Sequence, residues 1–203
     1  EKYMTRYVEG ILLSQIWWPN HCATIKFFRE NFIANNPPAF SHLEVGPGHG
    51  LFLYYASESP KCGSVTGWDV SAASLKSTGE CLKAMGVKKD ITLREVNLLN
   101  APDETFDSIT FSEVLEHLEQ PLEALKILHR VLKPGGRIMI NAPVNSPAPD
   151  HIYLFKTPEE VVEMIRQAGF TVEQHMYAPV AGVTLERARK FKFTISVVVV
   201  ATK

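Results

Sequence analysis

Short apolar runs alternate with longer amphipathic stretches from residue 40 to the end of the chain. The apolar runs are rich in β-branched and aromatic side chains, which is typical of buried strands. Seven such runs are the predicted strands: 40–45, 64–68, 91–96, 108–111, 137–141, 171–177 and 194–202. Strands that alternate with helices form a parallel sheet with helices on both of its faces. The last strand arrives without a long crossover helix, so we expect an antiparallel hairpin at the sheet edge.

The stretches between these runs carry the usual signals of helix ends. One helix is predicted to begin near His49, and three more are predicted to cover 71–85, 122–132 and 158–168. Ser71 is a suitable N-cap, and Gly86 and Gly169 are suitable stops. Lys133-Pro134-Gly135-Gly136 closes the leucine-rich helix. The predicted fold class is α/β, with a mostly parallel seven-stranded sheet and an antiparallel edge strand.

Residues 3–34 precede the first strand and have a helical pattern that is interrupted near Pro19. This region contains five aromatic residues that we single out: Trp17, Trp18, Phe27, Phe28 and Phe32. Their rings either pack the helices onto the sheet or make the segment a lid, with Trp17, Trp18 or His21 touching a substrate. We expect a single domain, 1–203, in which residues 1–36 are a helical extension or lid and 37–203 are the core.

Length and composition are those of an ordinary soluble globular protein. The 203 residues are 45% hydrophobic and 21% charged, which allows one domain with a sizeable core. The net charge of −1 gives no overall basic field for binding nucleic acid or a membrane. No apolar run reaches the length of a membrane span, and no signal-peptide pattern is found. The three cysteines have neither zinc-ligand nor disulfide spacing, so we expect a reducing, cytoplasmic location.

Three glycines at alternate positions, Gly46, Gly48 and Gly50, follow the first predicted strand. Glycine permits a tight turn and the close approach of a ligand because it has no Cβ. The helix that follows offers unpaired N–H groups to a ligand above the turn. A dinucleotide fingerprint would need its third glycine at position 51, which is Leu51. The loop therefore predicts a nucleotide-like ligand and disfavours a nicotinamide oxidoreductase.

Polar residues stand at the ends of the next three strands, where ligands bind in a doubly wound sheet. Asp69 ends the second strand, 69 − 46 = 23 residues after Gly46. A carboxylate at this place can accept hydrogen bonds from ribose hydroxyls. Asn97 ends the third strand, and Ser112 and Glu113 end the fourth.

These motifs together resemble the class I S-adenosylmethionine (SAM)-dependent methyltransferases. The E-x-G-x-G-x-G pattern over 44–50 looks like their motif I, and the sequences at 112–118 and 132–136 look like those around strands four and five. The similarity runs over roughly residues 40–145 and implies a Rossmann-like fold with SAM as cofactor. Asn97 stands where this superfamily commonly has an Asp that binds the adenine amino group. The implied cofactor-binding residues are Glu44, Gly46, Gly48, Gly50, Asp69, Val70, Asn97, Leu98, Ser112 and Glu113.

Glu113-x-x-Glu116-His117 resembles the E-x-x-E-H motif of ubiquinone-pathway O-methyltransferases and of small-RNA 2′-O-methyltransferases. In those families the motif holds a divalent cation together with a later histidine, for which this chain offers His151. Such a mixed oxygen and nitrogen site suits Mg²⁺, Mn²⁺ or Fe²⁺. The cation would orient a substrate hydroxyl and lower its pKa. Similar stretches occur in metal-free methyltransferases, where the histidine acts as a base or only donates a hydrogen bond.

We expect a SAM-dependent O-methyltransferase of a small molecule, with Glu116, His117 and His151 as catalytic residues. The expected metal ligands are Glu113, Glu116, His117 and His151, with Mg²⁺ or Mn²⁺ bound. One alternative is a metal-free N- or O-methyltransferase with His117 or His151 as base, and another is a non-catalytic SAM-binding subunit. The expected partner is a small-molecule acceptor, not nucleic acid. A basic run, Arg187 to Lys192, is either a solvated face or a surface that attracts an anionic substrate.

Overall fold

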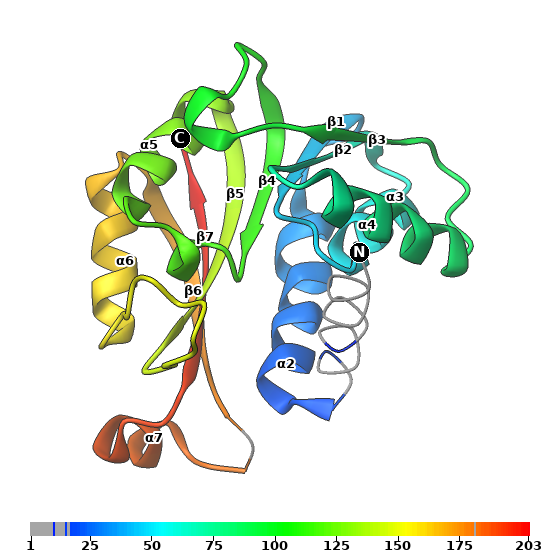
Figure 1. Cartoon of the computed structure of the whole chain (residues 1–203). Helices are drawn as coiled ribbons and strands as arrows, with labels where there is room; N and C mark the ends of the chain where they lie inside the picture. The colour runs from blue at the N-terminus through cyan, green and yellow to red at the C-terminus, as the bar shows by residue number, and fades with distance from the viewer. Residues whose placement is uncertain (1–9, 11–14, 16, 181) are drawn as a thin grey trace.

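The fold is built around one seven-stranded sheet, seen in a computed structural model that describes residues 10, 15, 17–180 and 182–203 (Figure 1). The strands are β1 (Phe40–Val45), β2 (Cys62–Asp69), β3 (Ile91–Glu95), β4 (Phe106–Ser112), β5 (Leu132–Val144), β6 (Thr171–Pro179) and β7 (Ile195–Thr202). Their order across the sheet is β3-β2-β1-β4-β5-β7-β6. Each predicted strand is present, so the expected α/β sheet is confirmed.

Strand order reverses between β1 and β4, which lie side by side and parallel. β1 to β5 are all parallel, whereas β7 is antiparallel to both of its neighbours, β5 and β6. The predicted hairpin does lie at the sheet edge. Within it the antiparallel strand β7 is the inner one and β6 forms the edge. The crevice above the β1–β4 reversal is where a doubly wound sheet binds its ligand.

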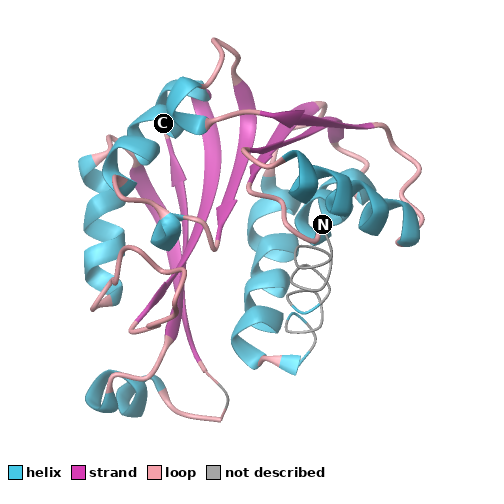
Figure 2. Cartoon of the chain, in the orientation of Figure 1, coloured by secondary structure: helices cyan, strands magenta, loops and turns pink. Residues whose placement is uncertain are grey.

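Helices cover both faces of the sheet (Figure 2). They are α2 (Pro19–Phe27), α3 (Leu51–Glu58), α4 (Ala72–Ala84), α5 (Pro121–Val131), α6 (Pro158–Gln167) and α7 (Leu185–Phe191). One face packs against α5 and α6, and the other against α2, α3 and the end of α4. The alternation of β5 shows this directly, because Ile138 and Ile140 face the first cluster and Met139 faces the second. Ser71 caps α4 as predicted, since its Oγ accepts from the Ser74 N–H at 3.2 Å.

The predicted N-terminal helix falls partly on residues 1–9, 11–14 and 16, which lie outside the described part of the chain. In the described part, the backbone is extended at Trp18 and α2 begins at Pro19. The helix continues through Phe28–Phe32 and Ile33–Asn35 with changed hydrogen-bond spacing. Phe28 and Phe32 are fully buried against the sheet, whereas Trp17 and Trp18 are exposed. Packing therefore explains the phenylalanines but not the tryptophans.

Two elements differ from the expectation. β5 begins at Leu132, directly after α5, and the register then jumps so that Arg137 pairs with Ser108. The four residues expected as a closing turn, 133–136, thus form an irregularity within the strand. The basic run contains a short helix, α7, which was not predicted from the sequence. Only Ala188 is buried in this helix, so its sequence has no apolar stripe. Among the described residues, no helix has the length and apolar character needed to cross a membrane.

Candidate active site

The glycine loop connects β1 to α3 and passes beside the end of β4. Gly46, Gly48 and Gly50 all have left-handed backbones, with φ of 71°, 50° and 74°. A Cβ on Gly46 would lie 2.6 Å from Val114 Cγ2, so no larger residue fits there. A Cβ on Gly48 would meet nothing within 4 Å. The loop is thus packed at Gly46 and open at Gly48, where a ligand can approach the backbone.

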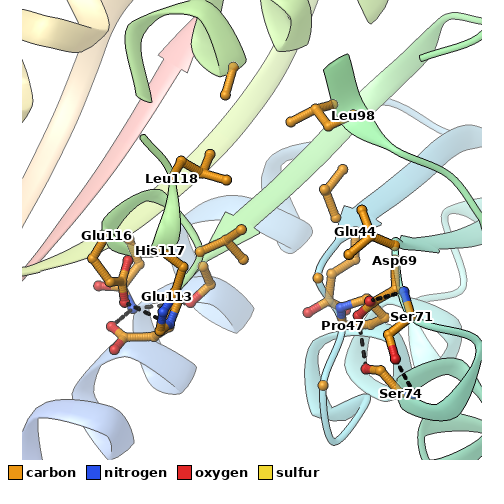
Figure 3. Close-up of a pocket in the computed structure, with 18 of the residues that line it drawn as sticks. Glu44, Pro47, Asp69, Ser71, Ser74, Leu98, Glu113, Glu116, His117 and Leu118 are labelled. Carbon is orange, nitrogen blue, oxygen red and sulfur yellow. Dashed lines mark hydrogen bonds and ion pairs between the residues drawn. The ribbon is translucent and has the colours of Figure 1, made fainter. Parts of the chain in front are cut away.

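Asp69 is held in place at the end of β2 by the first turn of α4. Its Oδ1 accepts from the Ser71 N–H at 2.9 Å, and its Oδ2 accepts from the Ser74 hydroxyl at 2.8 Å (Figure 3). Each carboxylate oxygen retains a second lone pair, so Asp69 can still accept hydrogen bonds from a ligand. Spacing could have indicated the role of Ser74, because Ser71 and Ser74 lie one helical turn apart.

Asn97 and Leu98 stand after β3 on the same side of the cavity as Asp69. The Asn97 Oδ1 accepts from the Leu99 N–H at 3.0 Å and caps a short helical turn. This bond directs one end of the amide to the backbone and leaves the Nδ2 donor for other partners. The neighbouring cavity wall is apolar and includes Val70, Val96 and Leu98. The arrangement suits a flat heteroaromatic ring.

Glu44 is a buried carboxyl beneath the glycine loop and is only 2% exposed. Burial raises its pKa well above the ordinary value, and the Leu53 backbone N–H opposes part of that effect. Its Oε2 has no hydrogen-bond partner among the described residues. A buried acceptor without a partner is costly, so Glu44 is suited to receive a donor from a bound ligand.

Ser112, Glu113 and Asn141 form one hydrogen-bonded group at the ends of β4 and β5. The Asn141 Nδ2 donates to Ser112 Oγ at 3.0 Å and to Glu113 Oε1 at 2.8 Å. Glu113 has a left-handed backbone, with φ of 54°, and its N–H donates to the Asn141 carbonyl. The strained backbone turns the Glu113 side chain away from the strand direction and toward the cavity.

Glu116, His117 and His151 come together beside this group. One ligand atom from each lies within 4.8 Å of the other two. His117 Nε2 is 3.9 Å from Glu116 Oε1. The His117 and His151 rings pack edge to face, with 5.0 Å between their centres. The motif residues belong to the turn after β4, whereas His151 belongs to the segment after β5. The structure therefore brings His151 beside His117, although the two residues are 34 positions apart in the sequence (151 − 117).

Both histidines of this group are oriented by backbone carbonyls. The Nδ1 of His117 is 2.8 Å from the Asp150 carbonyl, and the Nδ1 of His151 is 2.7 Å from the Ser146 carbonyl. A carbonyl oxygen can only accept, so each Nδ1 must carry the proton. In the neutral rings, each Nε2 then presents a lone pair that can bind a proton or a cation.

The segment 145–157 that carries His151 is fixed at its base. The Asn145 N–H donates to the Phe155 carbonyl at 2.8 Å, and the Tyr153 N–H donates to the Glu116 carbonyl at 2.9 Å. Asn145 itself has a left-handed backbone, with φ of 51°. Asn tolerates this conformation better than most residues. These bonds place the carbonyls that orient the two histidines.

Burial raises the pKa of the carboxyl groups of both Glu113 and Glu116, and Glu116 is only 1% exposed. For Glu116 the negative charges of Glu113 and Asp150 add to the effect on its pKa. Neither oxygen of Glu116 has a hydrogen-bond partner among the described residues. The group would therefore be stabilised by a proton or a cation placed between Glu116 and the two imidazoles.

A second pair of histidines, His21 and His49, has the opposite tautomer. Gln15 Nε2 lies 2.8 Å from His21 Nδ1, and the Leu51 N–H donates to His49 Nδ1 at 3.0 Å. Because each Nδ1 accepts, the neutral rings carry their proton on Nε2 and can donate it in a hydrogen bond. Burial lowers the pKa of both, that of His49 to about 4 with a further contribution from His21. Both rings are thus neutral near pH 7.

All these groups line one cavity of about 980 Å³. Figure 3 shows Asp69, Ser71 and Ser74 on one side of it and Glu113, Glu116 and His117 on the other. Nine of the ten expected cofactor-binding residues and all four expected metal ligands line the cavity; Gly50 instead packs against α4 at Thr78 and Leu82. Gln15 and Thr24 also line it and were not expected. The helical pattern around Pro19 could not have indicated Gln15 and Thr24, because it does not show which part of the core the N-terminal segment packs against.

Comparison with known families gives a match over the core of the sheet. Residues 43–140 match the family described as a methyltransferase domain. The ubiquinone/menaquinone biosynthesis C-methyltransferase UbiE of Escherichia fergusonii is 38% identical over 101 residues. The aligned part covers 48% of this chain and 40% of that relative, which is well under two thirds of its length.

Two solved structures have a similar fold. The N-methyltransferase NodS of Bradyrhizobium japonicum, in complex with S-adenosyl-L-homocysteine, is 19% identical with a TM-score of 0.69, covering 91% of this chain and 88% of that one. A SAM-dependent methyltransferase from Aquifex aeolicus is 20% identical with a TM-score of 0.67, covering 97% of both chains. At such identities the likeness shows the fold alone. The fold, the matched domain and the UbiE-like sequence together support the resemblance to the class I SAM-dependent methyltransferase superfamily.

Proposed function

We propose that this chain transfers the methyl group of SAM to a hydroxyl of a small-molecule acceptor. The observation that carries this proposal is the group of Glu116, His117 and His151, whose acceptor atoms converge within 4.8 Å at the wall of the cavity. A sulfonium methyl is already activated toward displacement. The protein must therefore chiefly align the acceptor with it and remove the proton of the hydroxyl.

The cofactor is assigned to the side of the cavity formed by β1, β2 and β3. Asp69, oriented by Ser71 and Ser74, accepts hydrogen bonds from the ribose hydroxyls, and Asn97 and Leu98 bind the adenine. The glycine loop leaves room for the methionine part at Gly48. Ser112, Glu113 and the unpaired Oε2 of Glu44 stand nearest to that part and provide acceptors for its amino group.

The acceptor is assigned to the side of the cavity formed after β4 and β5. His117 and His151 each present an Nε2 lone pair, and the Asp150 and Ser146 carbonyls hold the rings in that tautomer. A hydroxyl placed between them can donate its proton to one imidazole. A general base of this kind contributes roughly 10²–10⁴-fold to a rate.

The same three residues fit a divalent cation. Both oxygens of the buried Glu116 lack partners, and one carboxylate with two neutral imidazoles is a common donor set for such ions. A bound cation would supply Lewis acidity that lowers the pKa of the acceptor hydroxyl. The two nitrogen donors favour Mn²⁺ over Mg²⁺, which prefers oxygen. Glu113, expected as a fourth ligand, already accepts from Asn141 and is assigned to the methionine part of the cofactor.

The proposal is tested with labelled SAM and a panel of hydroxylated acceptors, with and without EDTA. We expect methyl transfer that EDTA abolishes and Mn²⁺ restores. We also expect weaker Mn²⁺ binding by Glu116→Gln in electron paramagnetic resonance. Activity that persists in excess EDTA would show that no metal is required and would leave His117 or His151 as the base. No transfer to any acceptor, with SAM bound, would support a non-catalytic SAM-binding subunit.

C-methylation is the second candidate, because the UbiE relative is named as a C-methyltransferase. Removing the proton of a phenol or enol makes nucleophilic both its oxygen and the carbon next to the oxygen-bearing one. The same residues would therefore serve either reaction. The ¹³C shift of the transferred methyl group separates the two products. A methyl ether supports the first candidate, and a methyl on carbon supports the second.

A further inference from the structure

Exposed aromatic side chains gather at one end of the molecule. Trp17 is 76% exposed, Trp18 54%, Phe191 55% and Phe193 38%. We call these four residues the aromatic rim. The Phe191 and Phe193 rings stack on each other at 6.0 Å instead of turning toward the core. Large exposed aromatic groups at one place are unusual unless something covers them.

The fold itself brings the two halves of the rim together. The buried Asn20 Nδ2 donates to Ser196 Oγ at 3.0 Å, which joins the start of α2 to the start of β7. Trp17 and Trp18 immediately precede α2, and Phe191 and Phe193 immediately precede β7. In Figure 1 the start of α2 and helix α7 both lie at the lower end of the molecule.

The segment that carries Phe191 and Phe193 is also basic. Residues 184–194 contain four Lys and Arg and one Glu, a local charge of +3 in a chain whose net charge is −1. Arg189 pairs with Glu159 at 2.6 Å. The described residues form no ion pair with Arg187, Lys190 or Lys192, and all three are exposed. The Arg187 and Lys190 cations lie 5.9 and 5.5 Å from the centre of the Phe191 ring.

Lys192 gives this surface its shape. It has a left-handed backbone, with φ of 55°, and the Phe193 N–H then donates to the Ala188 carbonyl at 2.9 Å. Helices that end in this way usually have glycine at the left-handed position, because a side chain there is unfavourable. The turn brings Phe193 beside Phe191 and leaves a lysine next to both rings.

We propose that the aromatic rim, together with Arg187, Lys190 and Lys192, is a docking surface for an anionic lipid bilayer. Phe and Trp side chains enter the boundary between headgroups and acyl chains, and Lys and Arg beside them attract anionic headgroups. The cationic area is too small to follow a nucleic-acid backbone, and the chain as a whole is slightly acidic.

The rim adjoins the candidate active site, because Trp18 is both exposed and part of the cavity wall. An apolar acceptor dissolved in a bilayer would reach the cavity without crossing water. Docking does not depend on the proposed function, since vesicle binding is measured without cofactor or acceptor.

Cosedimentation with vesicles tests the proposal. The whole chain should sediment with phosphatidylcholine vesicles that contain 30% phosphatidylglycerol and hardly at all with pure phosphatidylcholine. Loss of two surface cations should weaken binding about thirtyfold, so Lys190→Glu/Lys192→Glu should weaken it at least that much. Phe191→Ser/Phe193→Ser should also lose binding. Lys83→Glu/Lys88→Glu makes the same charge change on exposed lysines near the other end of the sheet and should have at most the small effect of net charge.

Tryptophan fluorescence gives a second readout in the folded wild-type chain. Trp17 and Trp18 should be quenched by brominated lipid, whereas the fully buried Trp68 should not. Circular dichroism confirms that each variant is folded. Equal sedimentation of all variants, absence of quenching, or binding to a polyanion such as heparin without binding to anionic vesicles would overturn the proposal.

Discussion

At the scale of single residues, hydrogen bonds to Nδ1 divide the four histidines of the cavity into two chemical classes. His117 and His151 donate from Nδ1 to carbonyls and keep an Nε2 lone pair, so they suit a proton or a metal. His21 and His49 accept at Nδ1 and carry the proton on Nε2, so they suit an oxygen of a ligand. Sequence alone shows four histidines but not this division, because it depends on how the backbone turns around each ring and, for His117, on the carbonyl of the distant Asp150.

Asp69 gives the first prediction. Asp69→Asn keeps the size of the side chain and removes the charge that would accept the ribose hydroxyls. Hydrogen bonds to a charged group contribute about 1.5–3 kcal/mol, so the Kd for S-adenosylhomocysteine should rise roughly 10- to 150-fold. Isothermal titration calorimetry measures this. Asp90→Asn, an exposed residue before β3, is the matched control and should leave the Kd unchanged. A similar Kd for all three proteins would remove Asp69 from the cofactor site.

His42 gives a prediction about stability and pH. It is fully buried on β1, where its Nδ1 lies 3.0 Å from Ser108 Oγ, and burial lowers its pKa to about 3. The unfolded chain binds a proton at this residue below about pH 6.5, while the folded chain does not. The free energy of unfolding should therefore fall as the pH drops from 6.5 toward 3, by about 1.4 kcal/mol per unit from this group.

Urea unfolding at several pH values measures the contribution of His42. Other groups titrate in the same range, so the informative quantity is the difference between wild type and His42→Asn. That difference should shrink as the pH falls from 7 to 5. A difference that is constant with pH would show that His42 has the same pKa in the folded and unfolded chains.

At the scale of elements, local pattern predicted each strand, and tertiary packing decided the rest. β1 falls on 40–45 as expected because six residues there have a clear apolar pattern before the glycines. β5 starts five residues earlier than expected (137 − 132), since the bulged residues 133–136 return to the sheet at Leu132. Helix α7 was missed because burial of Ala188 alone leaves no amphipathic stripe. The position of β7 between β5 and β6 depends on which strands pair, and hydrophobic periodicity does not encode strand pairing.

The N-terminal segment gives the prediction that belongs to this scale. Phe28 and Phe32 are fully buried in the same cluster as Phe40 and Phe52. Losing one such aromatic ring from a core costs about 3–5 kcal/mol, and a folded domain has only about 5–15 kcal/mol in total. A chain that begins at residue 37 should therefore show no cooperative thermal transition. Cooperative melting of that chain, with S-adenosylhomocysteine still bound, would instead make residues 1–36 a separable lid.

At the scale of the whole molecule, strand order explains why the sequence pointed to the correct edge of the sheet. The carboxyl ends of β1, β2 and β4 meet at the reversal point, which brings Glu44, Asp69 and Glu113 to one cavity. The motif at 113–117 and His151 were predicted to converge, and the three closest ligands are Glu116, His117 and His151. The carbonyls of Ser146 and Asp150 could not be predicted, since they depend on the path of the segment after β5.

The central claim is that Glu116 and the two histidines act on the acceptor, while the opposite side of the cavity binds the cofactor. The most direct measurement compares Glu116→Gln with wild type for both the rate of methyl transfer and the Kd for S-adenosylhomocysteine. The account predicts a rate at least ~100-fold lower with a Kd within about twofold of wild type, an energy difference of only ~0.4 kcal/mol. An unchanged rate, or a loss of cofactor affinity as large as the loss of rate, would contradict it.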